Sequence, residues 1–88
     1  MPTLDSLLFL TDFLDSLRGL SSSDQGRIFR ALALLDENDR HPSLSVHPLK
    51  GQQAGLHAAY ATKSLRITFR RLDAGRKELL SASQHYGD

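Results

Sequence analysis

The second half of the sequence gathers side chains that can move protons and bind phosphate. Imidazoles, cations and a phenol occur together there, namely His47, Lys50, His57, Arg66, Arg70, His85 and Tyr86. An imidazole with a pKa near ~6.5 can act as an acid or a base at neutral pH. Arginine offers a planar fork of donors to phosphoryl oxygens. These side chains fit RNA cleavage by its own 2′-hydroxyl, which needs a base, an acid and cations that offset the charge of the transition state.

Tyrosine adds a second function to this set. RNA is usually recognised through unstacked bases that lie on aromatic rings. Tyr60 and Tyr86 are the two tyrosines of the chain, and either can offer such a ring. Residue types alone leave the inference open, because four histidines in 88 residues is an ordinary number.

The sequence patterns of other chemistries are missing. Asp73 and Glu78 are isolated, so this region offers no carboxylate pair. There is no cysteine and no His-x-x-x-His spacing to suggest zinc. No glycine-rich phosphate loop precedes a helix, and no serine stands in a Gly-x-Ser-x-Gly elbow. We therefore predict neither a metal site nor a cofactor.

Length and composition bound the architecture. A chain of 88 residues predicts one domain, 1–88, with a small core and marginal stability. The absence of cysteine favours a reducing compartment. The apolar run Leu7–Leu10 is far shorter than the ~18–20 residues that span a bilayer, and it follows Asp5 rather than a basic segment. We expect a soluble, cytoplasmic protein that does not bind a membrane.

The net charge of +1 hides an asymmetry along the chain. Seven acidic residues and four arginines precede Ser45, which gives −3, whereas seven lysines and arginines and three acidic residues follow from Ser45 onward, which gives +4. The positive half holds the candidate chemistry, although a solvated polar face gives the same count.

Two helices are expected in the first half to support this region. Thr3–Leu10 is either an opening strand or the first turn of a helix, and its apolar run fits a buried strand. A short helix begins at Thr11 and stops near Gly19. Ser22, followed by Gln25 three residues later, predicts a capping box for a longer amphipathic helix. That helix is expected to end near Glu37.

Three strands are expected in the second half. An extended linker runs from His41 to Val46. Apolar and polar residues then alternate in 56–61 and in 65–70, on either side of a polar turn at 62–64, and a third strand covers 77–83 after a hairpin turn at 73–75. The order predicts an α+β, two-layer domain with two helices packed on one face of an antiparallel sheet. We expect the opposite, open face to carry His57, Arg66, Thr68 and Arg70.

The series of short motifs resembles a known family. A pair of apolar helices is followed by His-Pro-Leu-Lys-Gly, a Gly-Leu-x-Ala-x-Tyr strand, a Leu-Arg-Ile-x-Phe-Arg strand and a last strand that ends in His-Tyr. In this order the motifs resemble the RelE/ParE superfamily of bacterial toxin–antitoxin systems over nearly the whole chain. The closer likeness is to the RelE, YoeB, HigB and YafQ groups. Those toxins cut mRNA in the ribosomal A site without a metal, and an antitoxin wraps around them.

The resemblance implies roles for individual residues. His47 stands where these groups place a catalytic histidine or glutamate, and Arg66 matches an arginine that contacts the scissile phosphate. His85 matches a catalytic histidine near the C-terminus, with Tyr86 as the aromatic residue beside it. Further RNA contacts are assigned to Lys50, His57, Lys63, Arg70 and Arg71. The implied partners are mRNA on the ribosome and a cognate antitoxin, encoded by a neighbouring gene.

Two alternatives remain open at the sequence level. ParE-type members share the implied fold, lack the His/Arg/Tyr set and block DNA gyrase, so His47, Arg66 and His85 argue against that branch. A catalytically silent relative that only binds an antitoxin is the other alternative. The low net charge is unusual for a ribosome-binding toxin.

Overall fold

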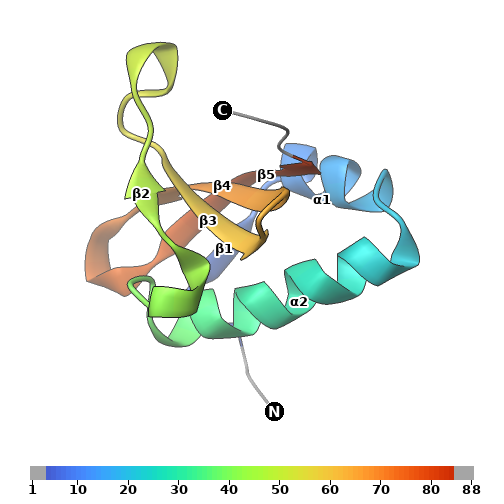
Figure 1. Ribbon diagram of the computed structural model, residues 1–88. Coiled ribbons are helices and arrows are strands. Elements are labelled where there is room, and N and C mark those ends of the chain that lie inside the picture. Colours follow the sequence, from blue (N-terminus) through green and yellow to red (C-terminus); the bar gives the residue numbers. More distant parts are fainter. Residues whose placement is uncertain (1–3, 85–88) are drawn as a thin grey trace.

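The computed structural model describes residues 4–84. Within them the chain forms two helices and five strands (Figure 1), in the order β1 (Leu7–Phe9), α1 (Thr11–Arg18), α2 (Ser22–Glu37), β2 (His47–Pro48), β3 (His57–Thr62), β4 (Leu65–Arg71) and β5 (Lys77–Gln84). The strands form one sheet in the order β1-β5-β4-β3-β2. β1 pairs with β5 in parallel, and every other pair is antiparallel. The predicted α+β, two-layer fold with two helices on a largely antiparallel sheet is confirmed.

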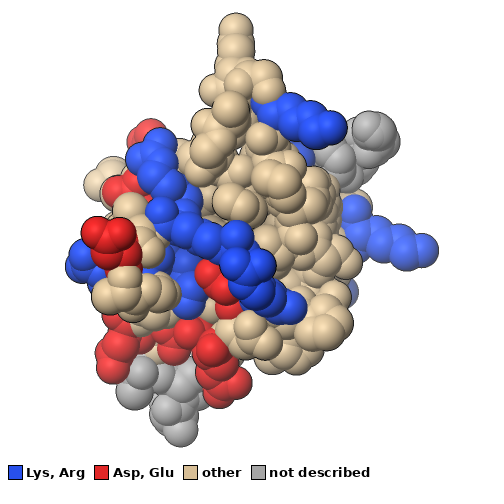
Figure 2. Space-filling model, turned by 90° about the vertical axis from the view of Figure 1, so that its left-hand side faces the viewer, with Lys and Arg blue, Asp and Glu red and all other residues tan. Residues whose placement is uncertain are grey.

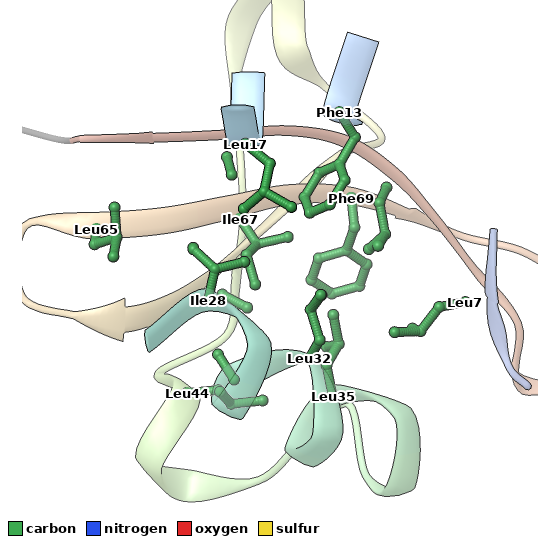
Figure 3. Packing of buried hydrophobic residues seen from close by; sticks show 14 residues of the cluster. Leu7, Phe13, Leu17, Ile28, Leu32, Leu35, Leu44, Leu65, Ile67 and Phe69 are labelled. Atoms are coloured by element: carbon green, nitrogen blue, oxygen red, sulfur yellow. The ribbon is translucent and has the colours of Figure 1, made fainter. Parts of the chain in front are cut away.

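The core lies between the helices and one face of the sheet. Ile28 and Leu32 of α2 pack in a single cluster with Ile67 and Phe69 of β4 (Figure 3). All four side chains are completely buried. Helix α1 adds Phe13 to the same cluster, beside β5. The period of two in β4 therefore identifies its inward face correctly, with Phe69 buried and Arg70 exposed.

Helix α2 begins one residue earlier than its predicted cap implies. The cap is Ser21, whose hydroxyl accepts a hydrogen bond of 3.1 Å from the backbone N–H of Asp24. Ser22 is the first helical residue, so the predicted Ser22–Gln25 capping box is wrong. The helix ends at Glu37, as expected.

Two further segments differ from the expectation. The linker between α2 and β2 is not extended throughout, because Pro42–Leu44 forms a 3₁₀ turn that buries Leu44. Near the N-terminus, the opening strand is a short edge strand rather than a buried one. Leu7 is buried, but Leu8 is 40% and Phe9 37% exposed.

A buried polar network joins three distant segments. Lys77 is 4% exposed, and its ammonium donates to the Ser6 hydroxyl over 3.0 Å and to the backbone carbonyl of Asp36 over 3.3 Å. The Ser6 hydroxyl in turn donates to the Asp36 carboxylate. Because Ser6 precedes β1, Asp36 lies at the end of α2 and Lys77 opens β5, this network ties the N-terminal segment to both layers. Burial of a charged group requires such hydrogen bonding.

Candidate functional site

The register of β3 and β4 determines which side chains face away from the helices. Ala59 lies opposite Ile67 and points into the core. Successive side chains of a strand point to opposite faces, so the neighbouring pair of Tyr60 and Arg66 lies on the face that the helices do not cover. We call this the open face. Arg66 therefore lies where the sequence predicted it.

His47 joins the open face from the edge strand β2. Its register partner is Ala58, two residues before Tyr60. The rings of His47 and Tyr60 are stacked, with centroids 5.6 Å apart and an interplanar angle of 17°. The Nδ1 of His47 lies 3.2 Å from the backbone carbonyl of Ser45. A carbonyl only accepts, so Nδ1 carries the proton in this contact, and the Nε2 of the neutral ring is left with a lone pair for use as a base.

Arg66 has an unusual environment for a strand arginine. The residue is half-buried, and its Nε–H is buried without a hydrogen-bond partner among the described residues. An unpaired buried donor costs on the order of 1–3 kcal/mol, and such groups are rare enough to need an explanation. The open face therefore holds an imidazole, a phenol and a guanidinium with unused donor capacity, one on each of the neighbouring strands β2, β3 and β4.

Three of the predicted RNA-binding cations are exposed. Lys50 lies after β2, at the base of the loop that projects from the sheet in Figure 1, and Lys63 lies in the turn between β3 and β4. Arg70 shares the open side of β4 with Arg66, and its guanidinium forms an ion pair of 2.9 Å with Glu78. Thr68, predicted to be open, lies between these arginines on the strand but is 4% exposed.

His57 and Arg71 do not lie on the open face, so the predicted position of His57 on that face is wrong, whereas the RNA contacts predicted for both residues stay predictions. His57 lies directly opposite Phe69 in the register, with the two rings 5.7 Å apart, so it is on the helix side of the sheet. Two residues after Phe69, Arg71 points to the same side. Its Nε donates to the Asp39 carboxylate over 2.9 Å, and its Nη1 lies 3.2 Å from the Nε2 of His57. Because guanidinium only donates, this Nε2 accepts, and the neutral ring carries its proton on Nδ1.

The surroundings of His57 disfavour its charged form. Burial is the largest cause that lowers the pKa of His57, followed by the charge of Arg71, while Asp39 acts in the opposite direction. The Nδ1 of the ring is buried and has no partner among the described residues.

The two C-terminal candidates, His85 and Tyr86, lie outside the described residues. Their predicted roles stay predictions.

Sequence reasoning missed two features of this region. It offered Tyr60 as a platform for a base but not as the ring that holds His47. It also missed Asp39, which pairs with Arg71 across 32 positions of the chain. An acidic residue at the end of a helix gives no signal that it binds a strand far away. The alternation of His57 with Ala59 was visible, but small alanines did not reveal which side was buried.

The described part of the chain offers neither a metal-binding cluster nor a membrane-spanning helix. Residues 4–84 contain no group of three or more histidines, aspartates or glutamates placed to hold a metal ion. No helix in the same range is both long and apolar enough to cross a membrane.

Comparisons with solved structures find the same fold in toxins. A YoeB/ParE toxin from Agrobacterium tumefaciens superposes with a TM-score of 0.75 and 20% identity, over 92% of this chain and 99% of the toxin. YafQ from E. coli gives a TM-score of 0.75 and 13% identity, over 89% and 90% of the two chains. The toxin–antitoxin complex RelBE2 from Mycobacterium tuberculosis matches with a TM-score of 0.63 and 23% identity. The match covers 91% of this chain and 96% of the matched chain.

These matches establish the RelE-like fold that the sequence resemblance implied. No protein-family model matches the sequence. A search of curated proteins likewise finds no match.

Proposed function

We propose that this protein is the toxin of a bacterial type II toxin–antitoxin system, and that it cleaves mRNA on the ribosome without a metal ion. The observation that carries the proposal is that Tyr60, on the open face of a RelE-like sheet, stacks on His47 and lies opposite Arg66 in the register. Arg66 there retains a buried donor without a partner among the described residues. A phosphoryl group on this face would meet both a base and a cation.

The proposed reaction uses the RNA's own 2′-hydroxyl as the nucleophile. The lone pair on the Nε2 of His47 takes the proton of this hydroxyl, and the 2′-oxygen forms a bond to phosphorus. The bond from phosphorus to the 5′-oxygen breaks, and an acid protonates the departing oxygen. The products are a 2′,3′-cyclic phosphate and a 5′-hydroxyl. Arg66 stabilises the negative charge that grows on the phosphoryl oxygens.

The remaining assignments come from the sequence resemblance. His85 is the proposed acid, and Tyr86 stacks on or orients the substrate. The exposed cations Lys50, Lys63 and Arg70 are proposed to contact the RNA backbone. Such contacts add affinity that weakens with salt.

An antitoxin is the proposed protein partner. The fold neighbours include a toxin–antitoxin complex, RelBE2, and E. coli YafQ in complex with DinJ. We expect the product of a neighbouring gene to bind this chain with nanomolar affinity in the cytoplasm, by means of a segment that folds on binding.

Single-turnover cleavage on programmed ribosomes tests the proposed activity. Wild-type protein should cut the bound mRNA and leave a 2′,3′-cyclic phosphate or 3′-phosphate and a 5′-hydroxyl. EDTA at levels that spare the ribosome should not stop the reaction. His85→Ala should slow it by at least ~100-fold, the range of a lost general acid.

Two other outcomes of these assays would each support an alternative function. Intact mRNA together with inhibited gyrase supercoiling would assign the chain to the gyrase-blocking branch. Inactivity in both assays would leave an antitoxin-binding protein without catalysis.

A further inference from the structure

A second cationic site lies on the helix side of β2 and meets the open face at His47, which lines both. It is a hollow of about 320 Å³ between the segment that follows α2 and the edge of the sheet. Its lining includes two arginines and three histidines, and no acidic residue is among the described residues that line it: Arg40, His41, His47, His57 and Arg71. We call this hollow the β2 pocket. Figure 2 shows this side of the molecule, where lysine and arginine side chains form a diagonal band.

The two arginines retain donors for a ligand. No hydrogen bond or ion pair engages the guanidinium of Arg40 in the described part of the chain, and the residue is exposed. Arg71 uses Nε and Nη2 on Asp39 and directs Nη1 toward His57. A guanidinium has five N–H donors, so Arg71 keeps two of them after these contacts. Asp39 fixes the plane of this guanidinium at the pocket wall.

His41 contributes a directed neutral donor. Its Nδ1 accepts a hydrogen bond of 3.2 Å from the backbone N–H of Ser43. The neutral ring therefore carries its proton on Nε2. Since Nδ1 is already engaged by the 3₁₀ turn, Nε2–H is the atom that His41 has for a ligand.

The pocket also contains charge that the protein itself does not offset. Burial and then the charge of Arg71 lower the pKa of His57, and Arg40 acts in the same direction, against Asp39. The pocket thus combines two permanent cations with one nearby carboxylate. A bound anion would supply the missing negative charge, and forked arginine donors match phosphate oxygens in particular.

We propose that the β2 pocket binds a phosphate group, held by Arg40, Arg71 and the Nε2–H of His41. The group can belong to free phosphate or a nucleotide, or to the backbone of an RNA strand. The inference rests on the geometry of the pocket and does not require cleavage on the open face. In the case of a strand, the pocket would hold a phosphate other than the scissile one, because His57 and Arg71 lie on the helix side of the sheet and Arg66 lies on the other side.

Heteronuclear NMR of the full chain tests the proposal. The ¹⁵N-labelled protein is titrated separately with inorganic phosphate, with adenosine 5′-monophosphate and with a 2′-O-methyl oligonucleotide that cannot be cut. Resonances of residues 40–48, His57 and Arg71 should shift together and saturate. Response to the two small ligands identifies a free-phosphate site, whereas saturation by the oligonucleotide alone identifies a backbone site.

Two variants and one control probe the donors without disturbing the core. Arg40→Gln should weaken binding about 10-fold, the value of a hydrogen bond to a charged group. His41→Asn keeps an acceptor near the position of Nδ1 and removes the Nε2–H, so it should weaken binding several-fold. Arg18→Gln removes another exposed arginine, on α1 and not among the lining residues, and should leave the affinity within about 2-fold.

Either of two results would overturn the proposal. One is the absence of saturable shifts in this segment with all three ligands. The other is equal loss of affinity in Arg40→Gln and Arg18→Gln, which would indicate diffuse attraction to the basic surface. Loss of mRNA cleavage would not bear on the pocket, because the titrations measure binding without turnover.

Discussion

The imidazole of His47 lies nearly parallel to the phenol ring of Tyr60, with 5.6 Å between the ring centroids. β2 is only two residues long and lies at the edge of the sheet. So short a strand gives little support of its own to a side chain. The longer strand β3 supplies that support through Tyr60, and the Ser45 carbonyl fixes the proton on Nδ1, which leaves the lone pair on Nε2. Tyr60 is therefore a positioning residue for the proposed base.

Tyr60→Leu should slow single-turnover cleavage by at least ~10-fold, because a misplaced catalytic group loses much of its effectiveness. Tyr60→Phe keeps the ring and should retain more of the rate. The ring protons of His47 provide a readout independent of activity. Their ring-current shift should disappear in the leucine variant and persist in the phenylalanine variant. Unchanged His47 shifts in both variants would contradict a positioning role.

Leu32→Ala should lower the free energy of unfolding by roughly 2–5 kcal/mol, the range for truncation of a buried leucine. Leu32 is completely buried between α2 and the sheet, whereas Leu14 on α1 is 39% exposed. Leu14→Ala is the matched control and should cost much less. Urea denaturation monitored by circular dichroism measures both. A similar loss in the two variants would refute the core assignment.

Ser21→Ala should destabilise the protein by about 1 kcal/mol, because the backbone N–H of Asp24 loses its hydroxyl acceptor. Ser22→Ala is the control in the same sequence context. It should be neutral or slightly stabilising, because Ser22 is the first helical residue and alanine has the higher helix propensity. Thermal unfolding of the two variants decides between the two caps. A larger loss of stability in Ser22→Ala than in Ser21→Ala would support the Ser22 capping box instead.

The cap illustrates which features of the fold a sequence can specify. Apolar periodicity is averaged over many residues, so the end of α2 and the inward face of β4 were predicted correctly, and the start of α2 was predicted to within one residue. The choice of cap among Ser21, Ser22 and Ser23 depends on one hydrogen bond, and all three residues have a hydroxyl. β2 has no periodicity of its own, since His47–Pro48 becomes a strand only through pairing with β3.

The candidate site was predictable to a similar extent. Arg66 was placed on the open face because it alternates with the large apolar residues of β4. His57 was misplaced because Ala59 and Ala61, which share its face of β3, are too small to indicate whether that face is buried. The contacts of Arg71 with Asp39 and His57 depend on how the end of α2 approaches the sheet edge. Local patterns contain no information about that approach.

Asp36 should make stability depend on pH. The hydrogen bond from the Ser6 hydroxyl is the main cause that lowers the pKa of the Asp36 carboxyl, with burial opposing it and Lys77 assisting. A carboxyl whose folded pKa lies below its unfolded value stabilises the fold above the unfolded pKa. This contribution is lost as the pH falls through the folded value.

The difference in the free energy of unfolding between wild type and Asp36→Asn should therefore be largest at pH 7 and shrink as the pH falls below about 4. Chemical denaturation at a series of pH values measures it. Asp15→Asn removes an exposed carboxylate on α1 and should change the free energy of unfolding by no more than about 0.5 kcal/mol. A difference between wild type and Asp36→Asn that stayed constant down to pH 2 would show that the hydrogen bond does not stabilise the charged form.

Arg66→Ala should slow single-turnover cleavage on programmed ribosomes by at least ~100-fold while binding to the ribosome is retained. One preorganised donor is worth on the order of 10²–10³ in rate, and a contact made only in the transition state lowers the rate constant without weakening ground-state affinity. Arg76→Ala removes an exposed arginine in the turn before β5 and should leave the rate nearly unchanged. The melting temperature separates catalysis from folding. The buried Nε–H of Arg66 has no partner among the described residues, so removing it leaves no acceptor there without its hydrogen bond. A large fall in both rate and melting temperature would instead make Arg66 a structural residue of the sheet.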